Sequence, residues 1–348
     1  MGGSGSGWPS PGRPNLTSDA VEIIEEQGHR NVIIIMADAL GADYLYQYRK
    51  SASIEGVLAV NFDFLTREGV KISDCLGARP PHTETGIARM FFGRDIILDH
   101  TQEPFLQIER LVQDSSQDHL LKLAVQHNKF VFNLLPRSDS AWLTQINIPR
   151  QKRLDILLWE SWKDQSNLLT NHSLEFKIEP NFPHLRKLKD QIKHSYPTDI
   201  SQTPFVQLKN LSQWVHNTSL TVIKHLLKTE ADGIFAFIHD PTLEFLGHWC
   251  GEQAYREGII WTDEYLGRLI AQLREQGVYD NTLILLTADH GMTFRTKDQL
   301  GNHGDFYSRP EVKYVPFIFN KKVPISNVIT SHASTLEVAK SWLENLEK

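Results

Sequence analysis

The sequence predicts an α/β fold in which a central, mostly parallel sheet is flanked by helices. Short apolar runs rich in β-branched and aromatic residues recur along the chain, with helical patterns between several of them. Residues that can bind metals follow directly where several of these runs end. Because ligands of such sheets sit beyond the carboxyl ends of the strands, we expect these polar residues to gather at one edge of the sheet.

The first run, Asn31 to Ala37 (NVIIIMA), is continuous and apolar and ends at Asp38. This pattern is typical of a central parallel strand that is buried on both faces. Similar runs predict further strands at Phe130 to Leu135, Gly233 to Ile238, Thr282 to Thr287 and Pro316 to Phe319. The polar residues that follow two of these runs, and that we expect near Asp38, are His239, Asp240, Asp289 and His290.

Two stretches have apolar residues at intervals of three and four, which predicts helices at Phe205 to Lys228 and Tyr255 to Glu275. Between residues 136 and 204 the pattern weakens, with several Trp, Lys and Pro residues and no clean series of strands. We therefore expect this segment to be a cap or insertion that covers the site and sets substrate choice. The predicted organisation is a flexible N-terminal tail at 1–29, a catalytic core at 30–135 and 205–348, and the cap at 136–204.

The composition limits the kinds of partner. A chain of 348 residues with 41% hydrophobic and 22% charged residues is typical of one large folded domain with an insertion. The formal net charge of -6 gives no basic footprint for a nucleic-acid backbone. No apolar run approaches the roughly 20 residues of a membrane-spanning helix. The opening residues lack the apolar segment of a signal peptide, which favours a cytoplasmic location, or a secreted or periplasmic one if such a segment was removed.

Two segments near the C-terminal half carry metal-binding residue types. In the first, TADHGM at 287–292, Asp289 and His290 stand side by side at a predicted strand end, followed by a glycine that lets the backbone turn sharply. In the second, GNHGD, a glycine-rich loop gives His303 the freedom to turn its ring toward a cation. A carboxylate and two imidazoles of this kind suit a divalent metal.

A third segment, HDPTLEFLGH at 239–248, leaves the strand predicted at Gly233 to Ile238. Glu244 and His248 are four residues apart, so on a helix they would share one face. Such a pair can bind a cation, although a surface contact between the two side chains would produce the same spacing.

A fourth segment, RPPHTETG at 79–86, predicts the start of a helix whose first turn contains Thr83 or Thr85. A hydroxyl at a helix N-terminus lies beside free backbone amides and the positive end of the helix dipole, which favours a bound phosphate. Plain N-capping by either threonine is the alternative, although neither has the acidic or amide residue three positions later that would complete a capping box.

Taken together, the four segments resemble the alkaline phosphatase superfamily, most nearly its type I phosphodiesterases and nucleotide pyrophosphatases, with phosphoethanolamine transferases and sulfatases next. The resemblance extends from Asn31 to Phe319 but leaves out the predicted cap. It implies a two-cation site. One cation would be held by Asp38, Asp289 and His290. The other would be held by His248, His303 and Glu244, or by Asp240 in place of Glu244, because the phosphodiesterases usually have aspartate at the position of Glu244.

The resemblance also implies the chemistry. Thr83 falls at the place of the nucleophile, with Thr85 as the next candidate. Sulfatases have C/S-x-P-x-R there, and this chain has TETGI at 83–87, which disfavours sulfatase activity of the usual kind. The expected function is hydrolysis of a small-molecule phosphate ester through a covalent phosphothreonine, with two divalent ions, Zn²⁺ best suited and Mn²⁺ as the alternative. Asn302 and Arg79 are candidate substrate contacts.

Three other functions remain open from the sequence. The chain could be a phosphomonoesterase, or a transferase of the same superfamily that passes its phosphoryl-bearing group to an alcohol. It could also be a pseudoenzyme or binding module whose metal site is impaired by Glu244.

Overall fold

The computed structural model describes most of the chain between Arg30 and Glu344. The described residues are 30–48, 54, 56–94, 107–108, 110–111, 118–136, 140–146, 152–158, 174–178, 183–199, 201–325 and 328–344. The predicted tail at 1–29 lies outside them.

The centre of the molecule is an eight-stranded sheet in the order β2-β8-β7-β1-β6-β3-β4-β5. The strands are β1 (Asn31–Ala37), β2 (Val70–Lys71), β3 (Phe130–Pro136), β4 (Arg153–Leu158), β5 (Leu174–Ile178), β6 (Ile234–Asp240), β7 (Thr282–Thr287) and β8 (Phe317–Phe319). The run from β7 through β4 is parallel, while β2, β8 and β5 join at the edges by antiparallel pairs. The predicted fold class is therefore confirmed.

The middle strands are buried over their whole length, as their apolar runs predict. β1 lies between β6 and β7, and every residue of these three strands is buried. The shared register places Met36 of β1 opposite both His239 of β6 and Thr287 of β7. Because the three strands are parallel and in step, their carboxyl ends meet at one edge of the sheet.

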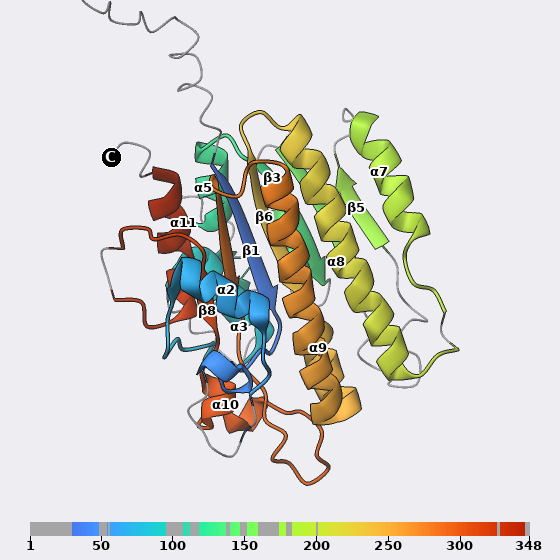
Figure 1. Ribbon diagram of the computed structural model, residues 1–348, viewed down its shortest axis with the longest axis vertical. Helices are drawn as coiled ribbons and strands as arrows, with labels where there is room; N and C mark the ends of the chain where they lie inside the picture. The colour runs from blue at the N-terminus through green and yellow to red at the C-terminus, as the bar shows by residue number, and fades with distance from the viewer. Residues whose placement is uncertain are drawn as a thin grey trace, which may run out of the picture.

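Helices cover both faces of the sheet (Figure 1). They are α2 (Val60–Glu68), α3 (Thr83–Phe92), α5 (Leu120–Gln126), α7 (Pro183–His194), α8 (Pro204–Thr229), α9 (Thr242–Glu275), α10 (Pro310–Lys313) and α11 (Thr335–Glu344). α8 and α9 pack against each other over one face, with α2 beside α9, and α3, α5 and α11 pack together on the other face. Both helices predicted from apolar spacing are confirmed, because they lie within α8 and α9.

The segment predicted as a cap differs from the expectation. No clean strands were expected between residues 136 and 204, but β4 and β5 lie here and extend the central sheet. Their apolar runs, RLDILL and LEFKI, are interrupted by charged residues, and this obscured them. One of these charges is buried with its partner: the guanidinium of Arg153 lies 2.8 Å from the carboxylate of Asp155. Residues 159–173 of the predicted cap lie outside the described residues, and whether this segment covers the site stays a prediction.

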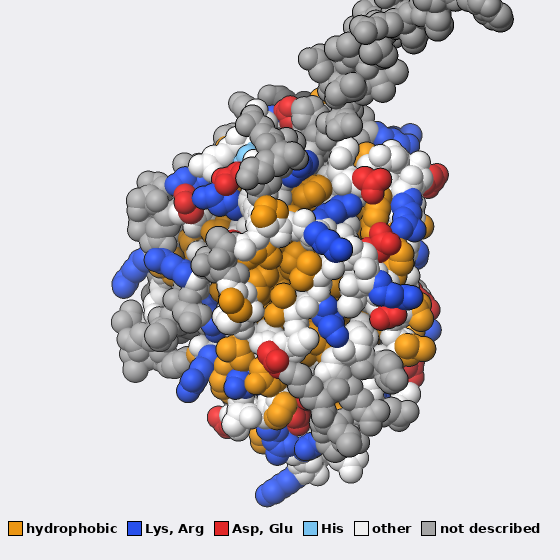
Figure 2. Space-filling model, turned by 60° about the vertical axis from the view of Figure 1, so that its left-hand side comes forward, with side chains coloured by type: hydrophobic (Ala, Val, Ile, Leu, Met, Phe, Trp, Pro, Cys, Tyr) orange, Lys and Arg blue, Asp and Glu red, His pale blue; other side chains and the backbone are white. Residues whose placement is uncertain are grey.

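The surface of the molecule is mixed in character. Figure 2 shows one face on which hydrophobic side chains lie among lysines and arginines. Among the described residues, the large hydrophobic side chains that are exposed are Leu58, Val60, Ile260 and Val328. Among the helices that the structure describes, none is both long and apolar enough to cross a membrane.

Candidate active site

The carboxyl edge of β1, β6 and β7 brings the predicted polar residues together. Asp38 directly follows β1, and its backbone N–H donates to the carbonyl of Asp240 at the end of β6 (3.0 Å). Asp289 and His290 follow β7 two and three residues after its end. The parallel register thus places residues that are 250 positions apart in the chain in direct contact: the N–H of Ala39 donates to Oδ1 of Asp289 (3.0 Å).

A first cluster consists of Asp38, Asp289 and His290. One ligand atom from each lies within 4.8 Å of the others, and all three side chains are fully buried. Nδ1 of His290 donates to the carbonyl of Gly291 (3.1 Å), which leaves Nε2 as the atom that faces the carboxylates. Nε2 lies 3.3 Å from Oδ2 of Asp289 without forming a hydrogen bond.

The loop after Asp38 is held in an unusual conformation. Ala39 has a φ of 60°, in the left-handed region that residues with a side chain rarely adopt. The N–H of Ala39 donates to Asp289, and its carbonyl accepts a hydrogen bond from the hydroxyl of Tyr255 (2.8 Å). The same hydroxyl accepts a hydrogen bond from the N–H of Gly41 (3.0 Å). Buried Tyr255 on α9 therefore fixes the backbone next to the first cluster. Nothing in the local sequence signals this contact.

A second cluster consists of Glu244, His248 and His303. Nε2 of His248 and Nε2 of His303 both donate to Oε1 of Glu244, at 2.8 and 2.9 Å. Glu244 and His248 lie one turn apart on α9, as their spacing predicts. His290 joins the two clusters, because its ligand atom also lies within 4.8 Å of those of Glu244 and His303 and its ring stacks on that of His303 at 4.0 Å between centroids.

Two glycines allow the second cluster to close. The N–H of Gly301 donates to the carbonyl of Gly247 (2.9 Å), so the loop before His303 lies against the helix turn before His248. A Cβ on Gly301 would come 2.8 Å from the carbonyl carbon of Gly247, closer than side chains tolerate. Gly247, next to His248, and Gly301, two residues before His303, are therefore part of the site.

The charges of the second cluster stabilise one another. Burial alone would raise the pKa of Glu244, but His303 and His248 outweigh it and hold the pKa well below its usual range. Burial alone would lower the pKa of His303, but the Glu244 carboxylate outweighs it and raises the pKa to about 9. At His290 in the first cluster burial prevails, and the pKa of this histidine is lowered.

The donor atoms fit divalent cations. In the part of the chain that the structure describes, the buried cluster atoms without a hydrogen-bond partner include Oε2 of Glu244, Oδ2 of Asp289 and Nε2 of His290. Burying such an atom without a hydrogen bond costs about 1–3 kcal/mol of stability, and more for a charged group. Buried polar atoms of this kind are therefore expected where a ligand such as a metal ion binds them. Carboxylate oxygens and imidazole nitrogens without thiolate are a ligand set for Zn²⁺ or Mn²⁺.

Thr83 is the first residue of α3, and residues on either side of it in the chain contact the two clusters. One turn further on, a Cβ on Gly86 would collide with the Cβ of Asp289, so this helix rests directly on the first cluster. Two residues before Thr83, the carbonyl of Pro81 accepts the Nδ1 proton of His303 (2.7 Å). The N-cap position is taken by His82, without a side-chain capping bond, so N-capping by Thr83 or Thr85 is wrong.

Asp240, the alternative to Glu244, has its carboxylate engaged elsewhere. Oδ2 accepts from Nε2 of His216 on α8 (2.7 Å), and Oδ1 accepts from the backbone and hydroxyl of Thr242 at the start of α9. The structure therefore brings Glu244, and not Asp240, together with His248 and His303.

The two candidate substrate contacts are less closely tied to the clusters. The guanidinium of Arg79 lies over the ring of Tyr307, 5.4 Å from its centroid, and its side chain is exposed. Asn302 is exposed and pairs through its backbone with Thr293. Both lie next to segments that hold the site, and their contact with substrate stays a prediction.

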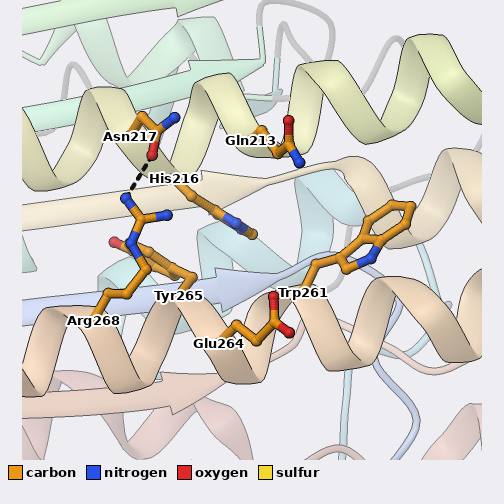
Figure 3. A pocket seen from close by; sticks show the side chains of 7 residues that line it. All are labelled: Gln213, His216, Asn217, Trp261, Glu264, Tyr265 and Arg268. Carbon is orange, nitrogen blue, oxygen red and sulfur yellow. Dashed lines mark hydrogen bonds between the residues drawn. The ribbon is translucent and has the colours of Figure 1, made fainter.

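A pocket of about 240 Å³ lies away from these clusters, between α8 and α9 (Figure 3). Buried His216 and Tyr265 line it and stack on each other, with 4.5 Å between ring centroids. The remaining lining residues are Gln213, Asn217, Trp261, Glu264 and Arg268. His216 connects this pocket to Asp240 at the end of β6.

Comparison with known proteins gives the family. The sequence profile of the family described as type I phosphodiesterase / nucleotide pyrophosphatase matches residues 137–322, a little over half of the chain. The chain belongs to this family. The matched segment contains Glu244, His248, Asp289, His290 and His303, whereas Asp38 and Thr83 precede it. The resemblance predicted from the four segments is confirmed. No curated protein matched the chain.

Solved structures share the fold at low sequence identity. A sulfatase from Pseudoalteromonas sp. is 16% identical, with a TM-score of 0.55 and coverage of 96% of this chain and 72% of the sulfatase. A protein in the alkaline phosphatase superfamily from Vibrio parahaemolyticus is 11% identical, with a TM-score of 0.56 and coverage of 91% and 66%. The soluble domain of a lipooligosaccharide phosphoethanolamine transferase from Neisseria meningitidis is 12% identical, with a TM-score of 0.52 and coverage of 92% and 89%. Family and fold together place this chain in the alkaline phosphatase superfamily.

Proposed function

We propose that this chain is a metal-dependent phosphodiesterase that acts on small-molecule phosphate esters through a phosphothreonine intermediate. The observation that carries the proposal is the set of buried, unpaired ligand atoms of Glu244, Asp289 and His290 beside the first turn of α3. Membership of the type I phosphodiesterase / nucleotide pyrophosphatase family supports the same chemistry.

The chain's own residues divide the work as follows. Asp38, Asp289 and His290 would hold one divalent ion, and Glu244, His248 and His303 would hold the other. When bound, such ions lower the pKa of a coordinated hydroxyl or water and neutralise charge that develops on the phosphoryl oxygens. The Oγ atom of Thr83 then forms a bond to phosphorus while the bond from phosphorus to the ester oxygen breaks and the alcohol leaves. The proton that Thr83 loses in this step leaves on the alcohol. Water then attacks the phosphothreonine, releases a phosphate monoester and supplies the proton that restores the Thr83 hydroxyl.

The position of Thr83 suits this role. A phosphate at the start of α3 meets backbone N–H groups that have no partner within the helix, together with the positive end of the helix dipole. Its side chain is 8% exposed, so the reaction would take place in a largely water-excluded setting where electrostatic stabilisation is strong.

The test is a substrate screen on metal-loaded protein. Bis-p-nitrophenyl phosphate, p-nitrophenyl phosphate and a phenyl phosphonate ester are compared with Zn²⁺ and with Mn²⁺. We expect the diester to be preferred and Thr83→Ala to lose turnover by at least about 10³-fold while metal content is unchanged. Thr85→Ala is the matched control, two residues along the same helix. Full activity of Thr83→Ala would assign the nucleophile elsewhere.

A transferase is the second candidate. The interval from Thr83 to Met90 and Phe91 is similar to that of the phosphoethanolamine transferases, and the phosphodiesterases usually have a slightly longer one. In a transferase, an alcohol replaces water as the group that attacks the phosphothreonine. Product analysis with and without an added alcohol separates the two functions. Absence of bound metal in purified protein would instead favour a pseudoenzyme.

A further inference from the structure

His239, at the end of β6, is a buried histidine that the proposed reaction does not use. Its Nε2 atom lies 2.9 Å from Oδ2 of Asp38, and its Nδ1 atom lies 3.3 Å from the hydroxyl of Ser140. All three side chains are fully buried. A carboxylate oxygen only accepts hydrogen bonds, so Nε2 carries the proton and donates it to Asp38.

Ser140 is itself fixed. Its hydroxyl donates to the carbonyl of Pro136 (2.8 Å), the last residue of β3, so its oxygen is fixed beside the ring of His239. A chain of contacts therefore runs from β3 through Ser140 and His239 to Asp38. It approaches Asp38 from the β6 side, whereas Asp289 and His290 approach from the β7 side.

The geometry separates His239 from the ligands themselves. In the described part of the chain, the three-residue groups with converging ligand atoms are Asp38 with Asp289 and His290, and Glu244 with His290 and His303. His239 touches the first group through Asp38 alone, with its protonated nitrogen directed at the carboxylate. The other ring nitrogen of His239 faces Ser140, so among the described residues neither of its nitrogens belongs to a group of converging ligand atoms.

We propose that His239, held by Ser140, is a positioning residue for Asp38 and thereby sets the affinity of the first cation site. This inference rests on the proposed function, because it assigns a role toward the same metal centre. Asp38 follows a strand end and precedes the strained backbone of Ala39, so its carboxylate needs an external partner to hold one orientation. Removing a group that orients a metal ligand in this way typically lowers metal affinity or activity by about 10- to 100-fold.

The experiment measures Zn²⁺ and Mn²⁺ binding to metal-stripped full-length protein by calorimetry. His239→Phe keeps a ring and removes the donor, so we expect the first site to bind about 10- to 100-fold more weakly while the second site is unchanged. His239→Gln restores an N–H donor and should recover most of the affinity. Ser140→Ala removes the contact between the serine hydroxyl and the ring of His239, and should weaken metal binding at the first site by a smaller factor. This variant also provides a test if His239→Phe does not fold.

Two comparisons make the result decisive. His119→Gln changes another buried histidine, which caps α5 by accepting the N–H of Lys122, and should leave both metal affinities unchanged. Visible spectra of the Co²⁺-loaded protein report ligand number directly. A changed ligand count in His239→Gln would show that His239 is a ligand and overturn the positioning role.

The outcomes also separate this inference from the proposed function. Wild-type protein that binds two metals and hydrolyses the diester, together with a His239→Phe variant of equal metal affinity, would overturn only the role of His239. Wild-type protein that binds no metal would overturn both.

Discussion

The two candidate metal-binding clusters are built from different parts of the fold. The first stands on strand ends: Asp38 follows β1, and Asp289 and His290 follow β7, all fully buried. In the second cluster, Glu244 and His248 come from α9 and His303 comes from the glycine-rich loop. The side chains of His248 and His303 are 26% and 15% exposed. The sheet fixes the first cluster through its register, whereas the second depends on how a helix and a loop meet. We therefore expect the first to be rigid and the second to be the adaptable side, open to water and leaving group.

The largest expected effect is on the first cluster. Asp289→Asn keeps the oxygen that accepts the Ala39 N–H and removes the negative charge. We expect loss of the first metal and a fall in kcat/KM of at least about 10³-fold with little change in thermal stability. Elemental analysis and diester kinetics check this. Loss of both metals would show that the clusters are not independent, as shared His290 allows.

The second cluster should be vulnerable at its glycine contact. In Gly301→Ala the new Cβ meets the backbone of Gly247, which should cost about 1–3 kcal/mol of stability and weaken the second site about 10- to 100-fold. Gly304→Ala, in the same loop, is the control, because its Cβ would meet only Asn302 at 4.0 Å. Equal metal binding by Gly301→Ala and wild type would mean that the loop adapts without this contact.

Glu244 tests how far the second cluster adapts. Glu244→Asp restores the residue that the phosphodiesterases usually have but shortens a carboxylate that reaches both His248 and His303. We expect the second site to bind about tenfold more weakly and its preference between Zn²⁺ and Mn²⁺ to change. Titration with each metal measures this, with Glu252→Asp on the same helix as control. Tighter binding by Glu244→Asp would contradict the expectation.

Tyr255 tests the rigidity of the first cluster. Tyr255→Phe leaves the Ala39 carbonyl and the Gly41 N–H buried without the hydroxyl, at a cost of about 1–3 kcal/mol. Chemical denaturation measures the loss, and affinity at the first site should fall with it. Tyr265→Phe, on the same helix and bonded to Ser219, should leave both metal sites unchanged.

The smallest effect concerns pH in metal-stripped protein. The folded-state pKa of His303 is raised from 6.5 to about 9, so its stabilising contribution is complete below pH 6.5 and is lost as pH rises through about 9. The depressed pKa of Glu244 gives stability that is present above 4.5 and lost in acid. We expect Tm to fall by about 2–4 °C between pH 6.5 and 9, and His303→Gln to show no such fall. An equal decline in both proteins would assign it to other groups.

The sequence alone determined the middle strands of the sheet and most of the first cluster. Continuous apolar runs are buried on both faces of a parallel sheet, so β1 and β7 begin and end where their runs do, and the polar residue after each run must lie at the carboxyl edge. The start of α3 near Thr83 followed from its prolines and the helical stretch after them. The sequence pattern did not predict the strands β4 and β5, because charged residues that are paired or partly buried interrupt their apolar runs.

Only the tertiary structure decided which groups meet. Asp240 and Glu244 are four residues apart, and both are carboxylates that can bind a metal. The carboxylate of Asp240, however, accepts a hydrogen bond from His216 of α8, which lies 24 positions earlier in the chain. Tyr255 and His239 reach the site through bonds to residues more than 200 positions away. Such contacts leave no local pattern, because a hydrogen bond depends on where two side chains end in space, and only the packing of the helices on the sheet fixes that.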